Sequence, residues 1–174
     1  MKKLQTPSVL NFAEPVSKYA GVPEFILGYR TNGQPMTDRP KLTNAPDIAE
    51  LLRQFITPDQ IGYREFFWVV CLSRYNQPLG VFNVSSGGIA GTVADPKVIF
   101  QIALLTNSSA IVCAHNHPSG NVKPSATDIS LTKKIVDAGK LLEVQVLDHI
   151  ILTPDSFFSM ANEGVMPSQT PPQS

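Results

Sequence analysis

Apolar residues along this chain fall into short blocks separated by turns rich in polar residues, glycine or proline. The runs at 66–72 and 110–114 are unbroken and β-rich, which is typical of strands that are buried on both faces. A last long strand is predicted over 144–152, and shorter strands over 24–29 and 79–84. The turn at 76–78 lies between two of these segments and predicts a β-hairpin.

Helical spacing of apolar residues marks the segments between these strands. Asn44 and Asp95 are N-cap residues, because Pro46 and Pro96 follow them inside the first turns. A third helix is predicted over 126–138, ending at Gly139 in the usual left-handed cap position. The predicted inward-facing residues are Ile48, Leu51, Leu52, Phe55, Val98, Ile99, Ile102, Ala103, Leu105, Ile129, Leu131, Ile135 and Val136. A short terminal helix is predicted from Phe157, Phe158 and Met160.

This order of elements predicts a single α/β domain with a mixed central β-sheet and helices on its faces. The domain is expected over residues 24–164. Residues 1–23 have no steady period and contain three prolines, so an irregular N-terminal segment is expected. Residues 165–174 are expected to form a disordered, proline-rich tail.

Composition narrows the class of protein. The chain has 174 residues, 14 basic and 14 acidic side chains, and charged residues make up 16% of it. An average soluble domain has about 25% charged residues. A charge-rich disordered chain and a strongly basic, histone-like nucleic-acid binder are therefore excluded. A TIM barrel is excluded as well, because that fold needs roughly 200 residues or more.

The apolar runs indicate where in the cell the protein is expected, and the positions of the cysteines indicate whether they form a disulfide. Lys2 and Lys3 resemble the start of a signal peptide, but no apolar stretch follows them. The longest apolar run is 66–72, whereas a membrane helix needs about 20 residues. A cytoplasmic protein without membrane association is expected. Cys71 and Cys113 lie inside apolar runs and are expected to be free, buried thiols.

One cluster of residues is suited to chemistry. The strand at 110–114 leads directly into His115 and His117, and side chains two apart on a strand share a face. Asp128 lies one turn into the helix that follows Ser125. Two imidazoles and one carboxylate, with an open fourth position, describe a catalytic zinc site. Zinc lowers the pKa of its bound water to about 7.

Other interpretations of these residues stay open. Ser125 and Asp128 also fit a helix capping box, and an isolated pair of histidines is more often packing than ligation. Glu65 is the candidate general base, because it enters the buried strand at 66–72, but fifty residues separate it from His115. Ser125 is a candidate hydroxyl donor to an oxyanion. His149 either orients a ligand or is a hydrogen-bonded core histidine beside Asp148, and we take the second interpretation.

The spacing of these residues resembles the JAMM signature of the JAB/MPN metalloproteases. His115-x-His117 is followed after seven residues by Ser125 and then by Asp128, with Glu65 upstream. The runs Ala114–Gly120 and Leu147–His149 are similar to the bacterial RadC-like branch, and the resemblance covers residues 24–164. It implies a JAB/MPN fold with cytidine-deaminase-like α/β/α layers, built around one zinc ion per chain.

The resemblance also implies a role for each residue. His115, His117 and Asp128 would be the zinc ligands, Glu65 the general acid and base, and Ser125 the oxyanion donor. The implied reaction is hydrolysis of a peptide or isopeptide bond in an unidentified protein or peptide. Asn116 is a departure from the eukaryotic isopeptidases, which carry Ser or Thr between the histidines. Deamination is not expected, since the sequence lacks Pro-Cys-x-x-Cys.

A second function is kept as an alternative: a DNA-repair or mobile-element accessory protein that associates with nucleic acid, with a structural or vestigial metal site. Its basis is a group of lysines near the loop and the helix, whereas the zero net charge counts against it. The lysines are Lys97, Lys123, Lys133, Lys134 and Lys140. The sequence does not indicate an oligomeric state.

Overall fold

The computed structural model describes residues 38–87 and 94–168. The chain divides after Asp38, and the unit that begins at Arg39 holds every helix and strand in the described part. The strand predicted over 24–29 and the irregular segment 1–23 lie outside the described residues, as do residues 169–174 of the predicted tail. None of the helices in the described ranges has the length and apolar character to cross a bilayer.

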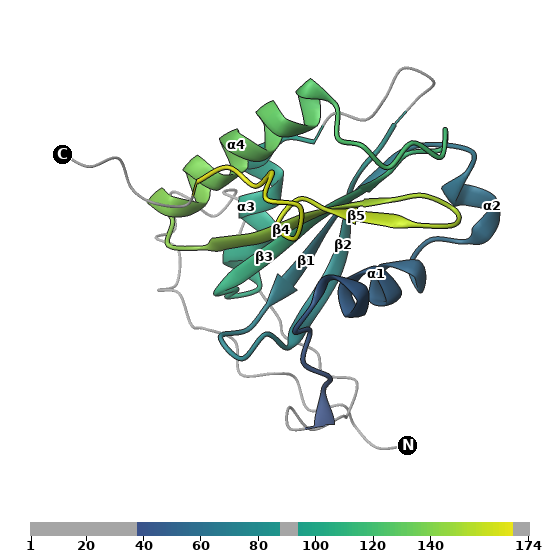
Figure 1. The fold of residues 1–174 in the computed structure, drawn as a ribbon. Coiled ribbons are helices and arrows are strands. Elements are labelled where there is room, and N and C mark those ends of the chain that lie inside the picture. The colour runs from purple at the N-terminus through teal and green to yellow at the C-terminus, as the bar shows by residue number, and fades with distance from the viewer. Residues whose placement is uncertain (1–37, 88–93, 169–174) are drawn as a thin grey trace, which may run out of the picture. The chain divides into compact units, whose positions relative to one another are not determined.

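The centre of the unit is a mixed five-stranded sheet in the order β2-β1-β3-β4-β5 (Figure 1). Only β3 and β4 run parallel; the other neighbouring pairs are antiparallel. The strands are β1 (Phe66–Leu72), β2 (Pro78–Ser86), β3 (Ala110–Asn116), β4 (Gln145–Leu152) and β5 (Phe157–Ser159). The predicted hairpin of β1 and β2 is confirmed.

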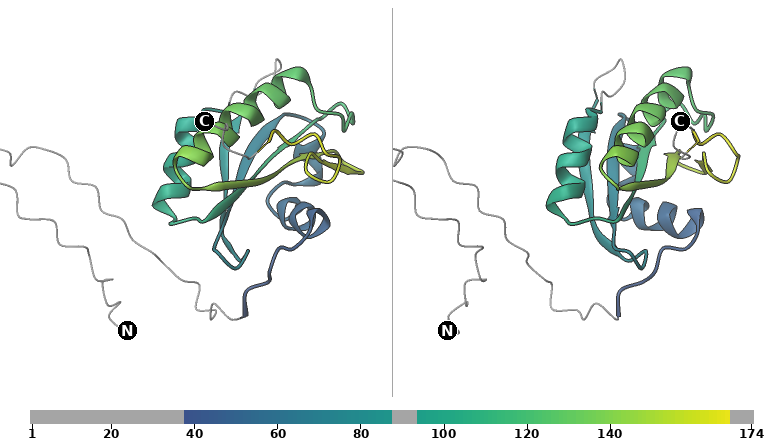
Figure 2. Two further views of the ribbon diagram at one scale, coloured as in Figure 1. Left: turned by 60° about the vertical axis from the view of Figure 1, so that its left-hand side comes forward. Right: turned by 90° about the vertical axis from the view of Figure 1, so that its left-hand side faces the viewer.

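Helices cover both faces of this sheet, as the two views of Figure 2 show. On one face lie α1 (Ala45–Arg53), which was predicted, and the short helix α2 (Pro58–Ile61). We did not predict α2 from the sequence. On the other face lie α3 (Pro96–Leu105) and α4 (Ala126–Leu141). The result is a single α/β domain with a mixed sheet between two helical layers, as predicted.

The period of two along β3 separates the two cores. Ala110, Val112 and Ala114 pack into the cluster beneath α1, whereas Ile111 and Cys113 pack into the cluster beneath α3 and α4. All residues of β3 are buried, so this strand is covered on both faces. Cys113 and Cys71 are free, buried thiols, as expected, and burial raises the pKa of the Cys113 thiol.

The predicted caps are confirmed. The Asn44 side chain accepts the backbone N–H of Asp47 at 2.9 Å, and the Asp95 side chain accepts that of Lys97 at 2.9 Å. The predicted inward stripes are wrong at four positions: Phe55, Val98, Leu105 and Ile129 are exposed. Phe100, only 4% exposed, enters the core from α3 in place of Leu105.

The predicted terminal helix is wrong, because Phe157–Ser159 form the edge strand β5. A tight turn after β4 brings the chain back, with the N–H of Thr153 donating to the carbonyl of Ser156 at 2.9 Å. The Arg53 guanidinium donates to the carbonyls of Thr153, Pro154 and Ser156 and holds this turn against α1. The turn leaves Phe157 and Phe158 extended beside β4, where they complete the ladder.

The predicted role of Gly139 as a left-handed cap is also wrong. Gly139 lies inside α4, and the residue with a left-handed backbone is Glu143, with φ 56°. A Cβ atom on Gly139 would lie 2.5 Å from the carbonyl oxygen of Val144, where the chain turns into β4. Glycine is therefore needed for the close approach of α4 to the start of that strand.

We expect Gly139→Ala to lower the free energy of unfolding. In an open helix position, alanine in place of glycine raises the free energy of unfolding by about 1 kcal/mol. Overpacking a buried site lowers it by about 1–3 kcal/mol. Urea denaturation measures the difference, with Ser130→Ala on the exposed side of α4 as a control that changes little. A stabilised Gly139→Ala protein would contradict the close contact.

Candidate metal centre

The pairing of β1 with β3 brings Glu65 close to the histidines, although fifty residues separate Glu65 from His115 in the sequence. The two strands are antiparallel, and Phe67 lies opposite His115. Glu65 is two residues before Phe67, so it shares a sheet face with Phe67. The start of β1 therefore lies beside the end of β3, and Glu65 comes next to the His115–His117 segment.

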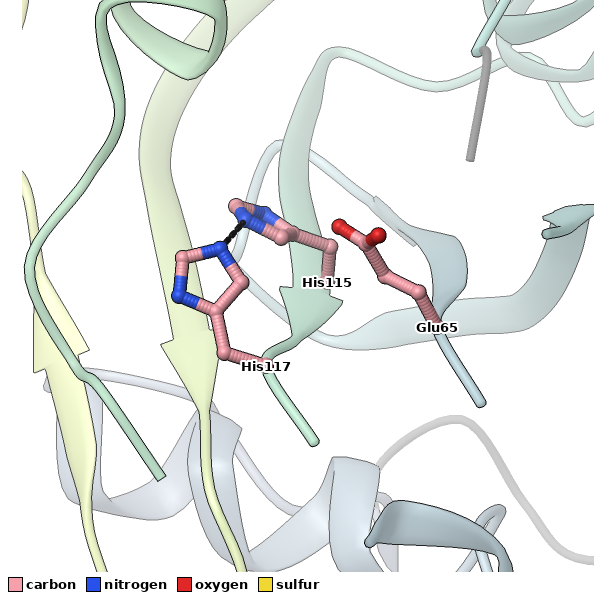
Figure 3. Close-up of side chains that lie close together, drawn as sticks. All are labelled: Glu65, His115 and His117. Atoms are coloured by element: carbon pink, nitrogen blue, oxygen red, sulfur yellow. Dashed lines mark hydrogen bonds between the residues drawn. The ribbon is translucent and has the colours of Figure 1, made fainter. Parts of the chain in front are cut away.

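Three side chains converge there, as Figure 3 shows. The Nε2 atoms of His115 and His117 lie 2.9 Å apart. A potential ligand atom from each of Glu65, His115 and His117 lies within 4.8 Å of the others. His115 is buried, whereas His117 and Glu65 are half-buried. These residues form a candidate metal-binding group.

Asp128 joins the same group from the first turn of α4. Its Oδ1 atom lies 3.4 Å from His115 Nε2, and its Oδ2 atom lies 3.7 Å from His117 Nε2. Burial raises the pKa of Asp128, but hydrogen bonds with His115, His117 and Ser125 hold it below its usual range. The Asp128 carboxylate in turn raises the pKa of His117. Asp128 is thus an ionised group facing both imidazoles.

Ser125 is the N-cap of α4 and binds Asp128 in three ways. Its hydroxyl and its backbone N–H each donate to Asp128 Oδ2 at 2.6 Å, and its Oγ accepts the backbone N–H of Asp128 at 3.1 Å. The helix-capping interpretation of this pair is therefore correct, but it does not exclude ligation. The cap occupies Oδ2, and Oδ1 is the carboxylate oxygen nearest to His115.

The orientation of His117 is determined by its other nitrogen. Nδ1 lies 2.6 Å from the backbone carbonyl oxygen of Asn121. A carbonyl only accepts hydrogen bonds, so the proton of the neutral ring is on Nδ1. The Nε2 atom then carries a lone pair, and it faces His115. A histidine held in this way by a backbone carbonyl is typical of a metal ligand.

His149 is a fully buried, hydrogen-bonded histidine beside Asp148, as interpreted from the sequence, but its ring contacts the site and not the Asp148 carboxylate. The Asp148 carboxylate accepts the backbone N–H of His149, the Ser159 hydroxyl and a further backbone N–H instead. The His149 ring lies with Nε2 2.8 Å from His115 Nδ1 and with Nδ1 2.5 Å from the Thr132 hydroxyl. Its burial lowers its pKa.

Asn116 has a role that we did not infer from the sequence. Because it lies between the histidines on a strand, its side chain points to the opposite face, toward α2. Its Oδ1 accepts the N–H of Phe66 at 2.8 Å, and its Nδ2 donates to the carbonyls of Ile61 and Arg64 at 2.7 and 2.8 Å. Asn116 therefore attaches the segment that carries Glu65 to the end of β3. The alternation of side chains along a strand was the feature of the sequence that could have predicted this orientation.

Comparison with known proteins agrees with this geometry. Residues 42–165 match the RadC-like JAB domain. That match covers most of the chain, and it includes all five candidate site residues. The chain belongs to the RadC-like JAB domain family. The JAB/MPN fold predicted from the resemblance is consistent with the observed sheet and layers.

Relatives in several bacteria support the same assignment. A UPF0758 protein of Flavobacterium johnsoniae is 34% identical over 139 residues, covering 80% of this chain and 59% of the relative. One of Desulfitobacterium hafniense is 35% identical, covering 80% and 60%. One of Moorella thermoacetica is 38% identical, covering 74% and 55%. This chain matches less than two thirds of the length of these relatives.

We expect Asn116→Asp to destabilise the protein by about 3 kcal/mol or more. The carboxylate would keep the bond to Phe66 but would place acceptors against the carbonyls of Ile61 and Arg64. Urea unfolding measures the loss. Asn83→Asp is the matched control, because Asn83 is exposed and its Oδ1 accepts a hydroxyl hydrogen bond. Equal effects of the two substitutions would contradict the role of Asn116.

Proposed function

We propose that this protein is a zinc-dependent hydrolase that cleaves a peptide or isopeptide bond. The observation that carries the proposal is the approach of His115 Nε2 and His117 Nε2 to 2.9 Å with the Asp128 carboxylate beside both. Two ring nitrogens this close require a proton or a cation near both of them. A metal ion satisfies the imidazoles and the carboxylate at once.

Zinc fits the donor set. Imidazole and carboxylate are common zinc ligands, and zinc–nitrogen bonds of about 2.0–2.1 Å in a tetrahedral site place two nitrogens roughly 3.3 Å apart. The observed pair would open by only a few tenths of an ångström. Three protein ligands leave one position for water or substrate, which is the arrangement of catalytic zinc sites.

We assign His115, His117 and Asp128 as the ligands. His115 and Asp128 are held by neighbouring groups, since Asp128 is fixed by the Ser125 cap and His115 by its buried partner His149. Glu65 lies just before β1, and it is half-buried beside the two histidines. This position suits a group that must accept and release a proton rather than stay bound.

Bound zinc would lower the pKa of a water molecule and polarise the substrate carbonyl. The chain's residues would supply the rest. Glu65 would take the proton from the attacking water and deliver it to the leaving amine. The Ser125 hydroxyl, which donates to Asp128 in this structure, would rotate to donate to the developing oxyanion. Asn116 would keep Glu65 in place throughout.

The alternative of a nucleic-acid accessory protein has less support. It rests on five lysines, and the exposed Asp137 carboxylate contacts two of them, Lys133 at 2.7 Å and Lys140 at 3.3 Å. Those contacts offset part of the positive charge along α4. Nucleic-acid affinity of this origin would fall steeply with salt concentration, so binding at low salt is the observation that would favour it.

We expect about one zinc ion per chain in the wild type and loss of zinc in a folded His117→Ala protein, measured by elemental mass spectrometry. The ligand assignment gives a sharper test with isosteric substitutions. Glu65→Gln should keep its zinc, whereas Asp128→Asn should bind zinc more weakly, since it replaces a ligand charge. The reverse result would assign Glu65 as the carboxylate ligand and contradict our choice.

We expect the zinc-loaded protein to cleave members of a peptide and lysine-isopeptide library, and a chelator to abolish the cleavage. Glu65→Gln should reduce the rate by about 10²–10⁴-fold, as for loss of a general acid–base. Ser125→Ala should reduce it by about 10²-fold or more. Mass spectrometry of the products measures both. Cleavage that survives in Glu65→Gln would rule out the proposed role of that residue.

A further inference from the structure

We propose that Thr132 and His149 fix the tautomer of His115, so that its Nε2 presents a lone pair to the metal position. Neither residue touches the proposed substrate or metal; both are positioning residues. The expected effect on zinc binding rests on the proposed function, whereas the hydrogen bonds between these residues do not. It is carried by a chain of three hydrogen bonds that starts at a backbone carbonyl and ends at His115.

The chain begins at Thr132, a buried residue of α4. Its Oγ1 lies 2.6 Å from the backbone carbonyl oxygen of Asp128, one turn earlier in the helix. A carbonyl has no proton, so the proton in this bond is that of the Thr132 hydroxyl. A hydroxyl has one proton, and Thr132 can therefore only accept in its second short contact.

That second contact is with His149. Its Nδ1 lies 2.5 Å from Thr132 Oγ1, so Nδ1 carries the proton and donates it. His149 is fully buried, and its ring nitrogens contact Thr132 and His115 rather than a carboxylate. A buried ring without a negatively charged partner is neutral. A neutral ring has one N–H, and the Nε2 atom of His149 is consequently an acceptor.

The last step reaches the candidate ligand. His149 Nε2 lies 2.8 Å from His115 Nδ1, so His115 Nδ1 carries the donated proton. The Nε2 atom of neutral His115 is then a lone pair, and it faces His117 Nε2 and Asp128 Oδ1. Because His117 is fixed by Asn121, both imidazoles present Nε2 lone pairs to the same point.

Packing keeps the two rings from rotating or finding other partners. His115 is 1% exposed and His149 is 0% exposed, so water does not replace either contact. Phe67 lies against both rings, parallel to His115 within 5° and edge-on to His149 with centroids 5.4 Å apart. Helix α4 thus contributes to the site twice, through the Asp128 carboxylate and, one turn later, through Thr132.

The experiment compares zinc affinity, by competition with a fluorescent chelator, in Thr132→Val, Thr132→Ser and the wild type. Valine keeps the shape but removes the acceptor, so His149 and His115 become free to adopt the other tautomers. We expect zinc binding to weaken about 10–100-fold in Thr132→Val, as for loss of an outer hydrogen-bond partner. Thr132→Ser should restore it.

The matched control is Thr106→Val, because Thr106 makes the same type of bond, to the Ile102 carbonyl at 2.8 Å, at the end of α3. It should leave zinc affinity unchanged. A merely structural role for Thr132 predicts reduced stability with unchanged zinc affinity, and that result would overturn the proposal. Equal weakening in Thr106→Val and Thr132→Val would overturn it as well.

A second measurement does not depend on a variant that folds. Long-range ¹H–¹⁵N NMR of the wild type, labelled at histidine, reports which ring nitrogen carries the proton. We expect His149 to be protonated at Nδ1 with and without zinc, and His115 to be protonated at Nδ1 when zinc is bound. A proton on His149 Nε2 would overturn the relay. A wild type that binds no zinc would contradict the proposed function, while the metal-free spectrum would still test the relay.

Discussion

The antiparallel pairing of β1 with β3 is the contact that brings Glu65 beside the two candidate histidines. With Phe67 opposite His115, the start of one strand meets the end of the other, and Glu65 reaches the histidines. Side chains alternate at the end of β3, so neighbouring residues there lie on opposite faces of the sheet. His115 and His117 face α4, whereas Asn116 faces α2 and attaches the segment before β1. A shift of one residue in this register would reverse both faces at once.

Helix α4 completes the site through its first turns. The Ser125 cap fixes the Asp128 carboxylate, and Thr132 continues the same face into the buried contact with His149. Capping the helix and placing the carboxylate are therefore a single arrangement, because the hydrogen bonds that begin the helix also orient Asp128. Gly139 allows the far end of α4 to approach β4, the strand that carries His149.

The sequence predicted much of this from local chemistry. Caps at Asn44 and Asp95, the buried strands and the spacing of His115, His117 and Asp128 depend on residues close in the chain. What it could not predict depends on contacts between distant segments. β5 forms because a turn returns the chain to β4, and Gly139 serves a contact with Val144 rather than a cap. The partner of His149 depended on which face of β4 meets α4.

The proposed function requires one zinc ion between the two facing histidine nitrogens. Anomalous diffraction at the zinc absorption edge, from crystals of the full chain grown with zinc, tests it most directly. We expect a single strong peak within bonding distance of Nε2 of His115, Nε2 of His117 and the carboxylate of Asp128, with Glu65 beside it but not bonded. A map without a peak between the two histidines, in crystals that contain zinc, would show that this metal site does not exist.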